Sequence, residues 1–201
     1  KNLSWRAFSP PQQTLDRVCQ ELGLSLDRPV WVLFTSSDDE VVSTTDWAGP
    51  FTRQLDWIQR TIEFAQQHSK IDLVIRVHPN TAGKKATGNN VAQLQEMEQL
   101  RSRLPKNVHI VMPEDPISSY SLMDIASLGL VYQSTVGLEM ACKGKSVVAA
   151  AGSYISDLPF VKTVRASEEY EAMLNAMLDL PLMATSTEVK RMAYRFAYGL
   201  F

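Results

Sequence analysis

Five short apolar runs, separated by segments of helical periodicity, are the feature that most constrains how this chain folds. Each run has four to seven residues, is rich in Val, Ile or Leu, and is too short for a helix, so we predict buried strands. Strands that alternate with helices are typical of a parallel sheet with helices on both faces. We therefore predict an α/β, Rossmann-like fold, a parallel sheet flanked by helices. The predicted strands cover residues 30–35, 71–77, 108–112, 129–132 and 146–150.

The helices are predicted from apolar residues at three-to-four spacing, such as Leu55, Ile58 and Ile62, and from Pro or Gly at their ends. We expect residues 1–28 to form an N-terminal linker and helix, and residues 29–201 to form the Rossmann-like domain with its C-terminal helices. Asp115 is the expected N-cap of one helix. The predicted helices cover residues 12–22, 51–67, 91–104, 117–126, 135–143, 167–180 and 186–198, with a short strand at 161–164.

Composition narrows the function classes. The formal net charge is −2, so the chain lacks the basic footprint of a nucleic-acid-binding protein. No stretch approaches the roughly 20 apolar residues that span a bilayer, and we recognise no signal peptide. The first residue is Lys1 rather than Met, so we expect an excised or processed chain. Only two cysteines, Cys19 and Cys142, are present, which fits reduced thiols in a cytoplasmic protein.

Metal and nucleotide motifs of the common kinds are missing. The three histidines, at 68, 78 and 109, are too scattered for a metal motif. Gly144-Lys145-Ser146 resembles the end of a phosphate-binding P-loop, but the first glycine of that motif is replaced by Glu139. That segment also leaves a helix and enters a strand, so we interpret Gly144 as a helix C-cap. No GxGxxG motif occurs.

The most informative motif is Arg76-Val77-His78-Pro79-Asn80, at the end of a predicted strand. Ligands of open α/β sheets bind beyond the carboxyl ends of the strands. Alternation places Arg76 and His78 on one side, where a histidine could donate to a phosphate oxygen and stabilise a departing phosphate. The alternative is a histidine that only caps the strand end, and the residues alone do not separate the two.

Two further loops end predicted strands with hydroxyl groups. Ser36 and Ser37 could bind a phosphate or sugar, or could serve only as local caps. Ser134 and Thr135 open a helix, where unpaired N–H groups and the helix dipole favour an anion. Gly137 could allow close approach of the ligand, and Glu139 could accept ribose hydroxyls. A simple capping box accounts for the same residues, and the capping and binding roles can hold together.

The loop after the third strand, Pro113-Glu114-Asp115, could read a nucleobase edge through the backbone of residues 112–114. For the Asp115 side chain we favour a capping role.

Taken in order, these motifs resemble the capsule polysaccharide biosynthesis proteins, which are GT-B glycosyltransferases that include bacterial Kdo transferases. The resemblance spans about residues 30–200. It also includes a C-terminal helix similar to the closing helix of that family. The segments that carry it are 34–40, 76–80, 113–115 with Ser119 and Tyr120, 134–139, 144–148 and 193–198.

The resemblance implies one half of a GT-B fold, the C-terminal half that binds the nucleotide of a sugar donor. It assigns His78, Ser134 and Thr135 to the donor phosphate, and relatives with an HP motif favour a CMP-activated sugar such as CMP-Kdo. It implies metal-independent chemistry without a cofactor, and a glycan or glycolipid acceptor. The catalytic acid/base of such enzymes comes from an N-terminal Rossmann domain, which does not precede Lys1 here.

Three alternatives remain open. The chain also resembles CDP-alcohol phosphotransferases of the teichoic-acid type, although those carry an aspartate where this chain has Glu139. A UDP-sugar epimerase fits the HP motif less well. A non-catalytic interaction module, with a homo-oligomer formed through the apolar tail 196–201, is the third. For the favoured function we expect location in the cytoplasm, at the inner face of the cell membrane if the acceptor is a glycolipid.

Overall fold

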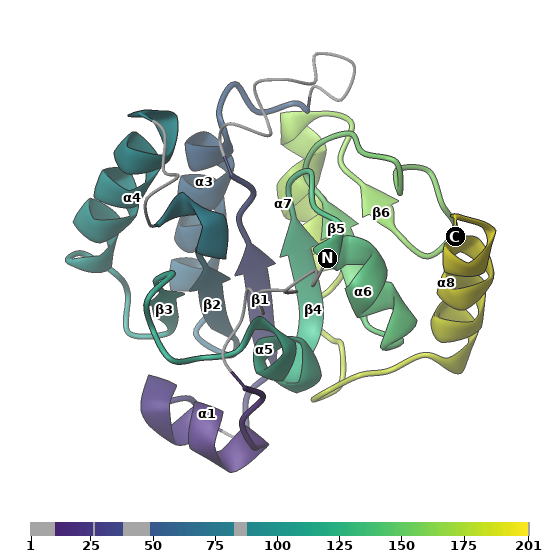
Figure 1. The fold of residues 1–201 in the computed structure, drawn as a ribbon, viewed down its shortest axis with the longest axis horizontal. Helices are drawn as coiled ribbons and strands as arrows, with labels where there is room; N and C mark the ends of the chain where they lie inside the picture. The colour runs from purple at the N-terminus through teal and green to yellow at the C-terminus, as the bar shows by residue number, and fades with distance from the viewer. Residues whose placement is uncertain (1–10, 26, 38–48, 83–87, 201) are drawn as a thin grey trace, which may run out of the picture.

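The computed structural model describes residues 11–25, 27–37, 49–82 and 88–200. Their centre is a six-stranded sheet in which every neighbouring pair is parallel and the order is β3-β2-β1-β4-β5-β6 (Figure 1). The predicted α/β, Rossmann-like fold is therefore confirmed. The strands are β1 (Val30–Phe34), β2 (Asp72–Arg76), β3 (Val108–Val111), β4 (Ala126–Val131), β5 (Ser146–Ala149) and β6 (Lys162–Thr163).

Helices cover both faces of this sheet. Helices α3, α4 and α7 contribute to the core on one face, and α1, α5, α6 and α8 contribute to the core on the other. The described helices are α1 (Leu15–Leu22), α3 (Gln54–Gln67), the 3-10 helix η2 (Pro79–Thr81), α4 (Gly88–Arg101), α5 (Ser119–Ile125), α6 (Val136–Cys142), α7 (Ser167–Asn175) and α8 (Thr187–Leu200).

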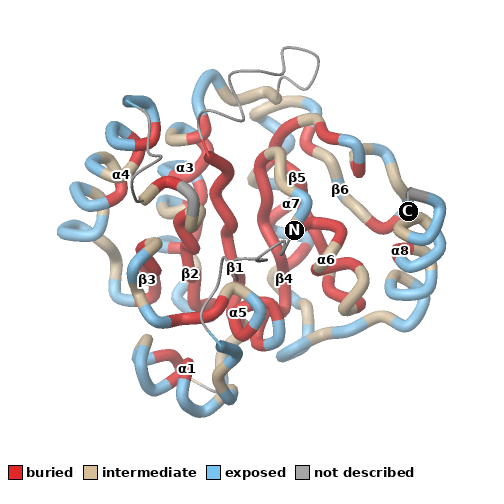
Figure 2. The backbone as a smooth tube through the Cα atoms, viewed as in Figure 1, coloured by how far each residue is buried: buried red, intermediate tan, exposed pale blue. Residues whose placement is uncertain are grey.

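The two hydrophobic cores follow from the alternation of side chains along the strands. In β1, Trp31 and Leu33 enter the core beneath α3, while Val32 and Phe34 enter the core beneath α5 and α6. All five residues of β1 are buried, as Figure 2 shows for the centre of the sheet. A parallel sheet covered on both faces explains why its strands are continuous apolar runs in the sequence.

Element boundaries differ from the sequence prediction at several ends. Helix α4 begins at Gly88 rather than at residue 91, and α7 ends at Asn175 rather than at 180. Asp115 does not cap α5, because Ser118 is the N-cap and its hydroxyl accepts from the N–H of Tyr120. Asp115 instead accepts a hydrogen bond from the N–H of Met112 at 2.8 Å, which closes the loop after β3. Residues 38–40, at the end of the segment 34–40 that carries the family resemblance, and residue 201 of the predicted apolar tail lie outside the described residues.

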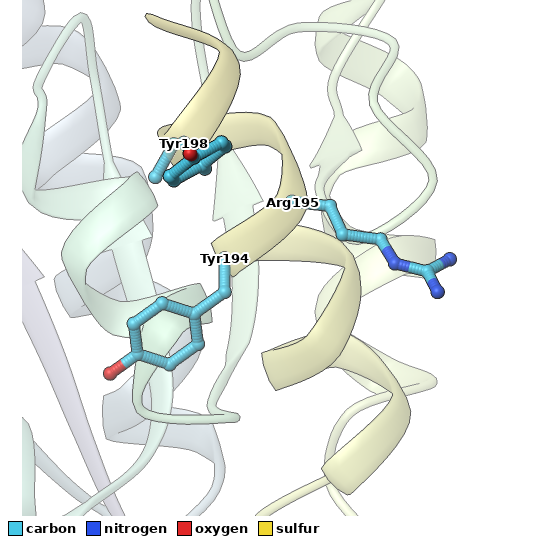
Figure 3. Close-up of a pocket in the computed structure, with 4 residues that line it drawn as sticks. Tyr194, Arg195 and Tyr198 are labelled. Atoms are coloured by element: carbon cyan, nitrogen blue, oxygen red, sulfur yellow. The ribbon is translucent and has the colours of Figure 1, made fainter. Parts of the chain in front are cut away.

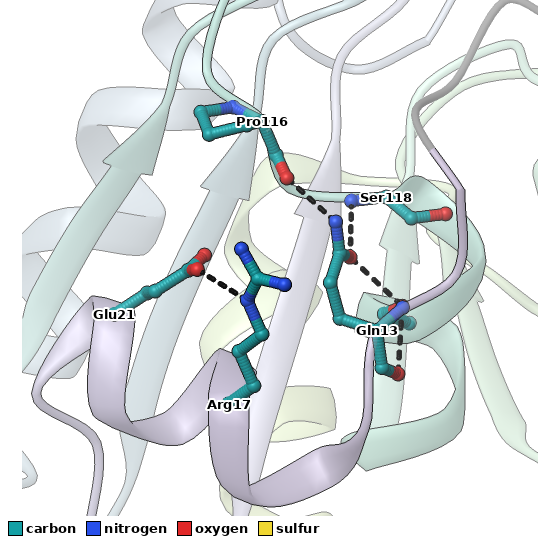
Figure 4. Close-up of polar contacts among 6 residues, drawn as sticks. Gln13, Arg17, Glu21, Pro116 and Ser118 are labelled. Atoms are coloured by element: carbon teal, nitrogen blue, oxygen red, sulfur yellow. Dashed lines mark hydrogen bonds and ion pairs between the residues drawn. The ribbon is translucent and has the colours of Figure 1, made fainter.

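The segment before α1 is fastened to α5 by one glutamine. The Gln13 amide donates to the Pro116 carbonyl at 2.6 Å and accepts from the Ser118 N–H at 3.0 Å (Figure 4). Its backbone N–H also donates to the Ser121 hydroxyl at 2.7 Å. These contacts connect the N-terminal segment to the turn that follows β3. In the described part of the chain no helix is both long and apolar enough to cross a membrane.

The turn after α6 contacts the residue that precedes α8, although β5, β6 and α7 lie between them in the chain. Gly144 has φ +78°, and its carbonyl accepts a hydrogen bond from the Ser186 N–H at 2.7 Å. A Cβ at Gly144 would lie 2.8 Å from the Ser186 carbonyl oxygen, closer than real contacts allow. Gly23, the C-cap of α1, also has a positive φ of +65°, but a Cβ there would meet nothing within 4 Å.

These two glycines form a matched pair for a stability test. We expect Gly23→Ala to lower the free energy of unfolding by about 1 kcal/mol, since only the left-handed backbone is penalised. Gly144→Ala should cost about 2–3 kcal/mol, because the new methyl group also meets the Ser186 backbone. Chemical denaturation of both variants measures the difference. Equal losses would mean that the contact with Ser186 does not hold α8 in place.

Candidate functional site

The strand order places a candidate site at the carboxyl ends of β1 and β4. The chain runs outward from β1 through β2 to β3, then returns to the other side of β1 with β4. Ligands of doubly wound sheets bind in the crevice at such a reversal. Phe34 of β1 is in register with Arg76 of β2 and Val131 of β4, so the loops after these three strands begin at the same level.

Ser36 is the hub of the hydrogen bonds at this edge. Its N–H donates to the Gln54 side chain at 2.7 Å, and its carbonyl accepts from the side chains of Gln54 and Gln93 at 3.1 and 2.9 Å. Its hydroxyl accepts from the Gln133 N–H at 3.3 Å, which links the loops after β1 and β4. Ser36 is 2% exposed and bonded through all three groups, so it holds the loops of this edge together, and its contact with a ligand stays a prediction.

Ser37 takes a similar place. It is 3% exposed, and its hydroxyl donates to the Asn90 side chain of α4 at 2.9 Å. The hydroxyl proton of Ser37 is thus used within the fold, and the predicted phosphate contact of this residue stays a prediction.

His78 lies just beyond β2 and is partly exposed. Its N–H donates to the Thr35 hydroxyl at 2.9 Å, and its carbonyl accepts from the Thr81 hydroxyl at 2.7 Å. These bonds fix the backbone of His78 beside the end of β1. Asn80 lies within the following 3-10 helix η2. The structure therefore brings His78 to the predicted edge, while its role toward a ligand stays a prediction.

Arg76 occupies a different position from the predicted one. It is 1% exposed, and its guanidinium donates to the Met112 carbonyl at 2.6 Å and to the Ser119 hydroxyl at 3.2 Å. Burial lowers the pKa of this guanidinium, and the charges of Asp115 and Glu114 oppose that effect. The side chain braces the loop after β3 from inside, and the binding role of Arg76 stays a prediction.

The same contacts involve the backbone of residues 112–114, which was predicted to bind a nucleobase edge. The Met112 N–H is held by Asp115, and its carbonyl is held by Arg76, so neither is open to a base. Pro113 is half-buried and Glu114 is exposed at the same turn. A hollow of about 360 Å³ lies beside Glu114. Its lining residues are Leu94, Gln95, Glu98, Gln99, Met112 and Glu114.

The start of α6 presents two hydroxyl groups at the end of β4. Ser134 is half-buried and its hydroxyl accepts from the Val136 N–H at 3.3 Å, while Thr135 is exposed. Gly137 is buried, and a Cβ there would lie 2.5 Å from the Ile155 side chain and 3.3 Å from Val131. Gly137 therefore lets α6 pack closely on Ile155 and Val131, and its predicted role in admitting a ligand stays a prediction.

Glu139 points toward α5 and forms a small polar cluster. The Tyr120 hydroxyl hydrogen-bonds to its carboxylate, and the Lys143 charge is near. Burial raises the pKa of the Glu139 carboxyl, and Tyr120 and Lys143 oppose that rise. The pKa of Tyr120 is raised, first by the charge of Glu139. A half-buried carboxylate with one strong donor can still accept hydroxyl groups from a ligand.

Three residues of this edge were not predicted as site residues. Thr35 is the first residue after β1, and its hydroxyl accepts from the His78 N–H. Gln133 is the second residue after β4, and its N–H donates to the Ser36 hydroxyl. The position after a strand at the switch point is their only sequence signal. Tyr120 has no signal in spacing, because its link to Glu139 depends on how α5 packs beside α6. Among the described residues, no group of three or more His, Cys, Asp or Glu could hold a metal ion.

No family model matches the chain, and no curated protein matches it in sequence. Its structure resembles UDP-GlcNAc 2-epimerase from Neisseria meningitidis bound to UDP-GlcNAc, with TM-score 0.51 and 13% identity over 92% of this chain and 47% of that one. A putative UDP-N-acetylglucosamine 2-epimerase from Listeria monocytogenes gives TM-score 0.50 and 11% identity over 99% and 48%. The beta Kdo 2,4 transferase KpsC from Thermosulfurimonas dismutans gives only 0.49, with 14% identity over 83% and 43%.

The chain is therefore a Rossmann-like α/β domain with the fold of one half of a GT-B protein. It spans about half the length of the two epimerase chains. At these identities the likeness establishes the fold alone, so the resemblance to the capsule polysaccharide family stays a prediction.

The hydrogen bond from Tyr120 can be tested through the titration of Glu139. Tyr120→Phe should raise the pKa of the Glu139 carboxyl further. The hydrogen bond from Tyr120 favours the ionised carboxylate, so its loss leaves the effect of burial, which raises the pKa, less compensated. Carbon-13 NMR of the side-chain carboxyl during a pH titration measures this. Tyr154→Phe is the control, since Tyr154 feels the charge of Glu139 but is not among the groups that shift it. An unchanged titration in Tyr120→Phe would remove the proposed pairing.

Proposed function

We propose that this domain binds the nucleotide of an activated sugar, as the donor half of a glycosyltransferase in capsule or surface polysaccharide biosynthesis. One observation carries the proposal: His78 and the Ser134-Thr135 pair follow β2 and β4, beside the switch point of a GT-B-type sheet. Support also comes from the fold shared with an epimerase whose structure holds UDP-GlcNAc.

The donor phosphate would lie between His78 and the start of α6. Thr135 is exposed there, and the first turn of a helix carries a partial positive charge toward an anion. A protonated or donating His78 would stabilise the leaving phosphate as negative charge develops on it. Chemistry of this kind needs no metal ion. The acid/base group would come from a second domain, as in other GT-B enzymes.

The ribose would lie nearer Glu139, whose carboxylate faces Tyr120 and can accept hydroxyl groups. A cytidine nucleotide, with CMP-Kdo as an example of the donor, is favoured by the HP motif at residues 78 and 79. The acceptor would be a glycan or glycolipid. A CDP-alcohol phosphotransferase of the teichoic-acid type remains an alternative with the same base, and so does an interaction module without catalysis.

One observation favours a second candidate. Both solved structures that establish the fold are UDP-GlcNAc 2-epimerases or putative ones, which suggests a uridine nucleotide. The two candidates share the phosphate site and differ in the base, so nucleotide preference separates them.

The decisive experiment is calorimetric titration of the chain with CMP, CDP and UDP in parallel, with EDTA present. We expect CMP or CDP to bind, and the same affinity after EDTA is replaced by magnesium. Preference for UDP would support the epimerase candidate instead. A folded sample that binds none of the three would contradict nucleotide binding by this domain.

Two substitutions locate the phosphate. His78→Ala should weaken nucleotide binding about ten- to a hundredfold, because it removes a hydrogen bond to a charged group worth roughly 1.5–3 kcal/mol. Thr135→Val should weaken it about fivefold, and Thr187→Val, which alters an exposed threonine at the start of α8, should leave affinity unchanged. Loss of affinity in Thr187→Val, or none in His78→Ala, would contradict the assignment. Circular dichroism confirms that each variant is folded.

Protonation of Glu139 predicts the pH dependence. If the ribose hydroxyls donate to the carboxylate, affinity falls as pH drops through the pKa of Glu139. Because burial raises that pKa, the fall begins at higher pH than for an ordinary glutamate. Glu139→Gln should bind less tightly at neutral pH and lose this pH dependence. A wild-type affinity that is flat from neutral to mildly acidic pH would place the ribose elsewhere.

A further inference from the structure

Helix α8 exposes one face that no other part of the described chain covers. Tyr198 is 89% exposed and Tyr194 is 55% exposed, which makes them the two most exposed large apolar side chains described. Arg191, Tyr194 and Tyr198 recur at three- and four-residue spacing, so they share one side of the helix. Figure 3 shows Tyr194, Arg195 and Tyr198 projecting outward, around a shallow hollow of about 730 Å³.

The opposite face of α8 fixes the helix to the domain. Ala193 is fully buried against the core beneath α6. The Phe196 ring packs on Phe160 and Tyr154, with ring centres 6.1 and 6.4 Å apart. Phe196 therefore packs on its own fold and is partly buried, while the predicted homo-oligomer contact through residues 196–201 stays a prediction. The outward face is left as a rigid surface rather than as a loose tail.

This face is also basic. Lys190, Arg191 and Arg195 are exposed, and Glu188 is the single acidic residue of the helix. No carboxylate in the described part of the chain forms an ion pair with these three cations, although Lys190 lies over the Tyr194 ring at 6.0 Å. Elsewhere six arginines are ion-paired. They are Arg17, Arg28, Arg53, Arg60, Arg101 and Arg165.

We propose that the outward face of α8 docks on the surface of an anionic phospholipid bilayer. Tyrosines with an apolar ring and a polar tip suit the headgroup layer, and unpaired cations beside them are attracted to anionic lipids. A nucleic acid is the weaker partner, because the chain as a whole has a net charge of −2, with 20 Lys and Arg against 22 Asp and Glu. The proposal does not rest on nucleotide binding, since it uses a different surface.

Sedimentation with lipid vesicles tests the proposal directly. The chain should pellet with vesicles of phosphatidylglycerol and phosphatidylcholine at millimolar lipid, and remain in solution with phosphatidylcholine alone. Binding should weaken as salt rises from about 50 to about 500 mM, because the attraction is screened. Equal binding to both vesicle types, or no binding to the anionic ones, overturns the proposal.

Matched variants locate the surface. Arg191→Gln with Arg195→Gln should lower partitioning about 25-fold, as each cation near an anionic surface contributes roughly fivefold. Tyr194→Ser with Tyr198→Ser should lower it as well. Arg103→Gln with Lys106→Gln removes the same charge from two exposed sites outside α8 and should change it less than about threefold. Equal effects of the two charge pairs would show attraction without a defined face and overturn the proposal.

Two measurements separate membrane docking from a contact between copies of the chain and from nucleotide binding. Sedimentation velocity should show a monomer whose mass is unchanged by Tyr194→Ser with Tyr198→Ser. A dimer that this pair dissociates would make the face a contact between copies, and would overturn membrane docking. Nucleotide titration of Arg191→Gln with Arg195→Gln should match the wild type, so failure of vesicle binding and failure of nucleotide binding remain distinct results.

Discussion

The arrangement of the candidate site depends on the buried hydrogen bonds around Ser36. One residue receives two glutamine side chains from α3 and α4 on its carbonyl, and the backbone of the loop after β4 on its hydroxyl. Leaving any such buried group without a partner costs about 1–3 kcal/mol. Ser36 thereby links the loops after β1 and β4, and the neighbouring Thr35 hydroxyl holds the loop after β2 through the His78 N–H. His78 and Ser134 therefore keep their places without help from a ligand.

A second buried group extends the scaffold to the other side of the edge. The charge of Arg76 is brought into the protein, where Nε donates to the Ser119 hydroxyl and Nη1 to the Met112 carbonyl, which ties β2 to the turn before α5. That turn also receives the Gln13 side chain from the segment before α1. Tyr120, the next residue but one after Ser118, is thus presented to Glu139 from a turn braced on two sides. At the carboxyl edge of the sheet, some polar residues therefore hold the loops together, and others are left exposed.

Much of the fold could be predicted from the sequence, because burial on both faces of a parallel sheet leaves a direct pattern. The runs that contain Trp31, Ile75 and Leu130 have no polar face, and only a covered parallel sheet explains them. Boundaries were harder to predict. Helix α4 extends back to Gly88 although glycine favours helices poorly, since packing of Asn90 and Gln93 on the site edge holds its first turns.

The position of the candidate site in the fold could be predicted from the sequence, but the side chains that face a ligand could not. Strand ends predicted that residues 36, 78 and 134 lie at one edge of the sheet, because parallel strands bring their carboxyl ends together, and all three follow the neighbouring strands β1, β2 and β4. Which of them faces a ligand was not predictable, since Ser36 and Thr135 are both hydroxyl residues after a strand and only packing buries the first. Arg76 illustrates the same limit: alternation gave its side of the strand, but Ser119 and Met112, which fill that side, come from a loop more than 30 residues away.

The two proposed binding surfaces lie on α6 and α8, two helices that pack against each other. Helix α6 begins at the candidate phosphate site and ends at Cys142, and the carbonyl of Gly144 in the following turn accepts a hydrogen bond from the Ser186 N–H just before α8. Helix α8 packs along α6 with Ala193 in the shared core, although β5, β6 and α7 lie between the two helices in the chain. A bilayer held by α8 would therefore sit at a fixed distance and angle from a nucleotide held at α6. For an enzyme that transfers a sugar to a lipid-linked acceptor, such a fixed geometry would set where the acceptor must enter.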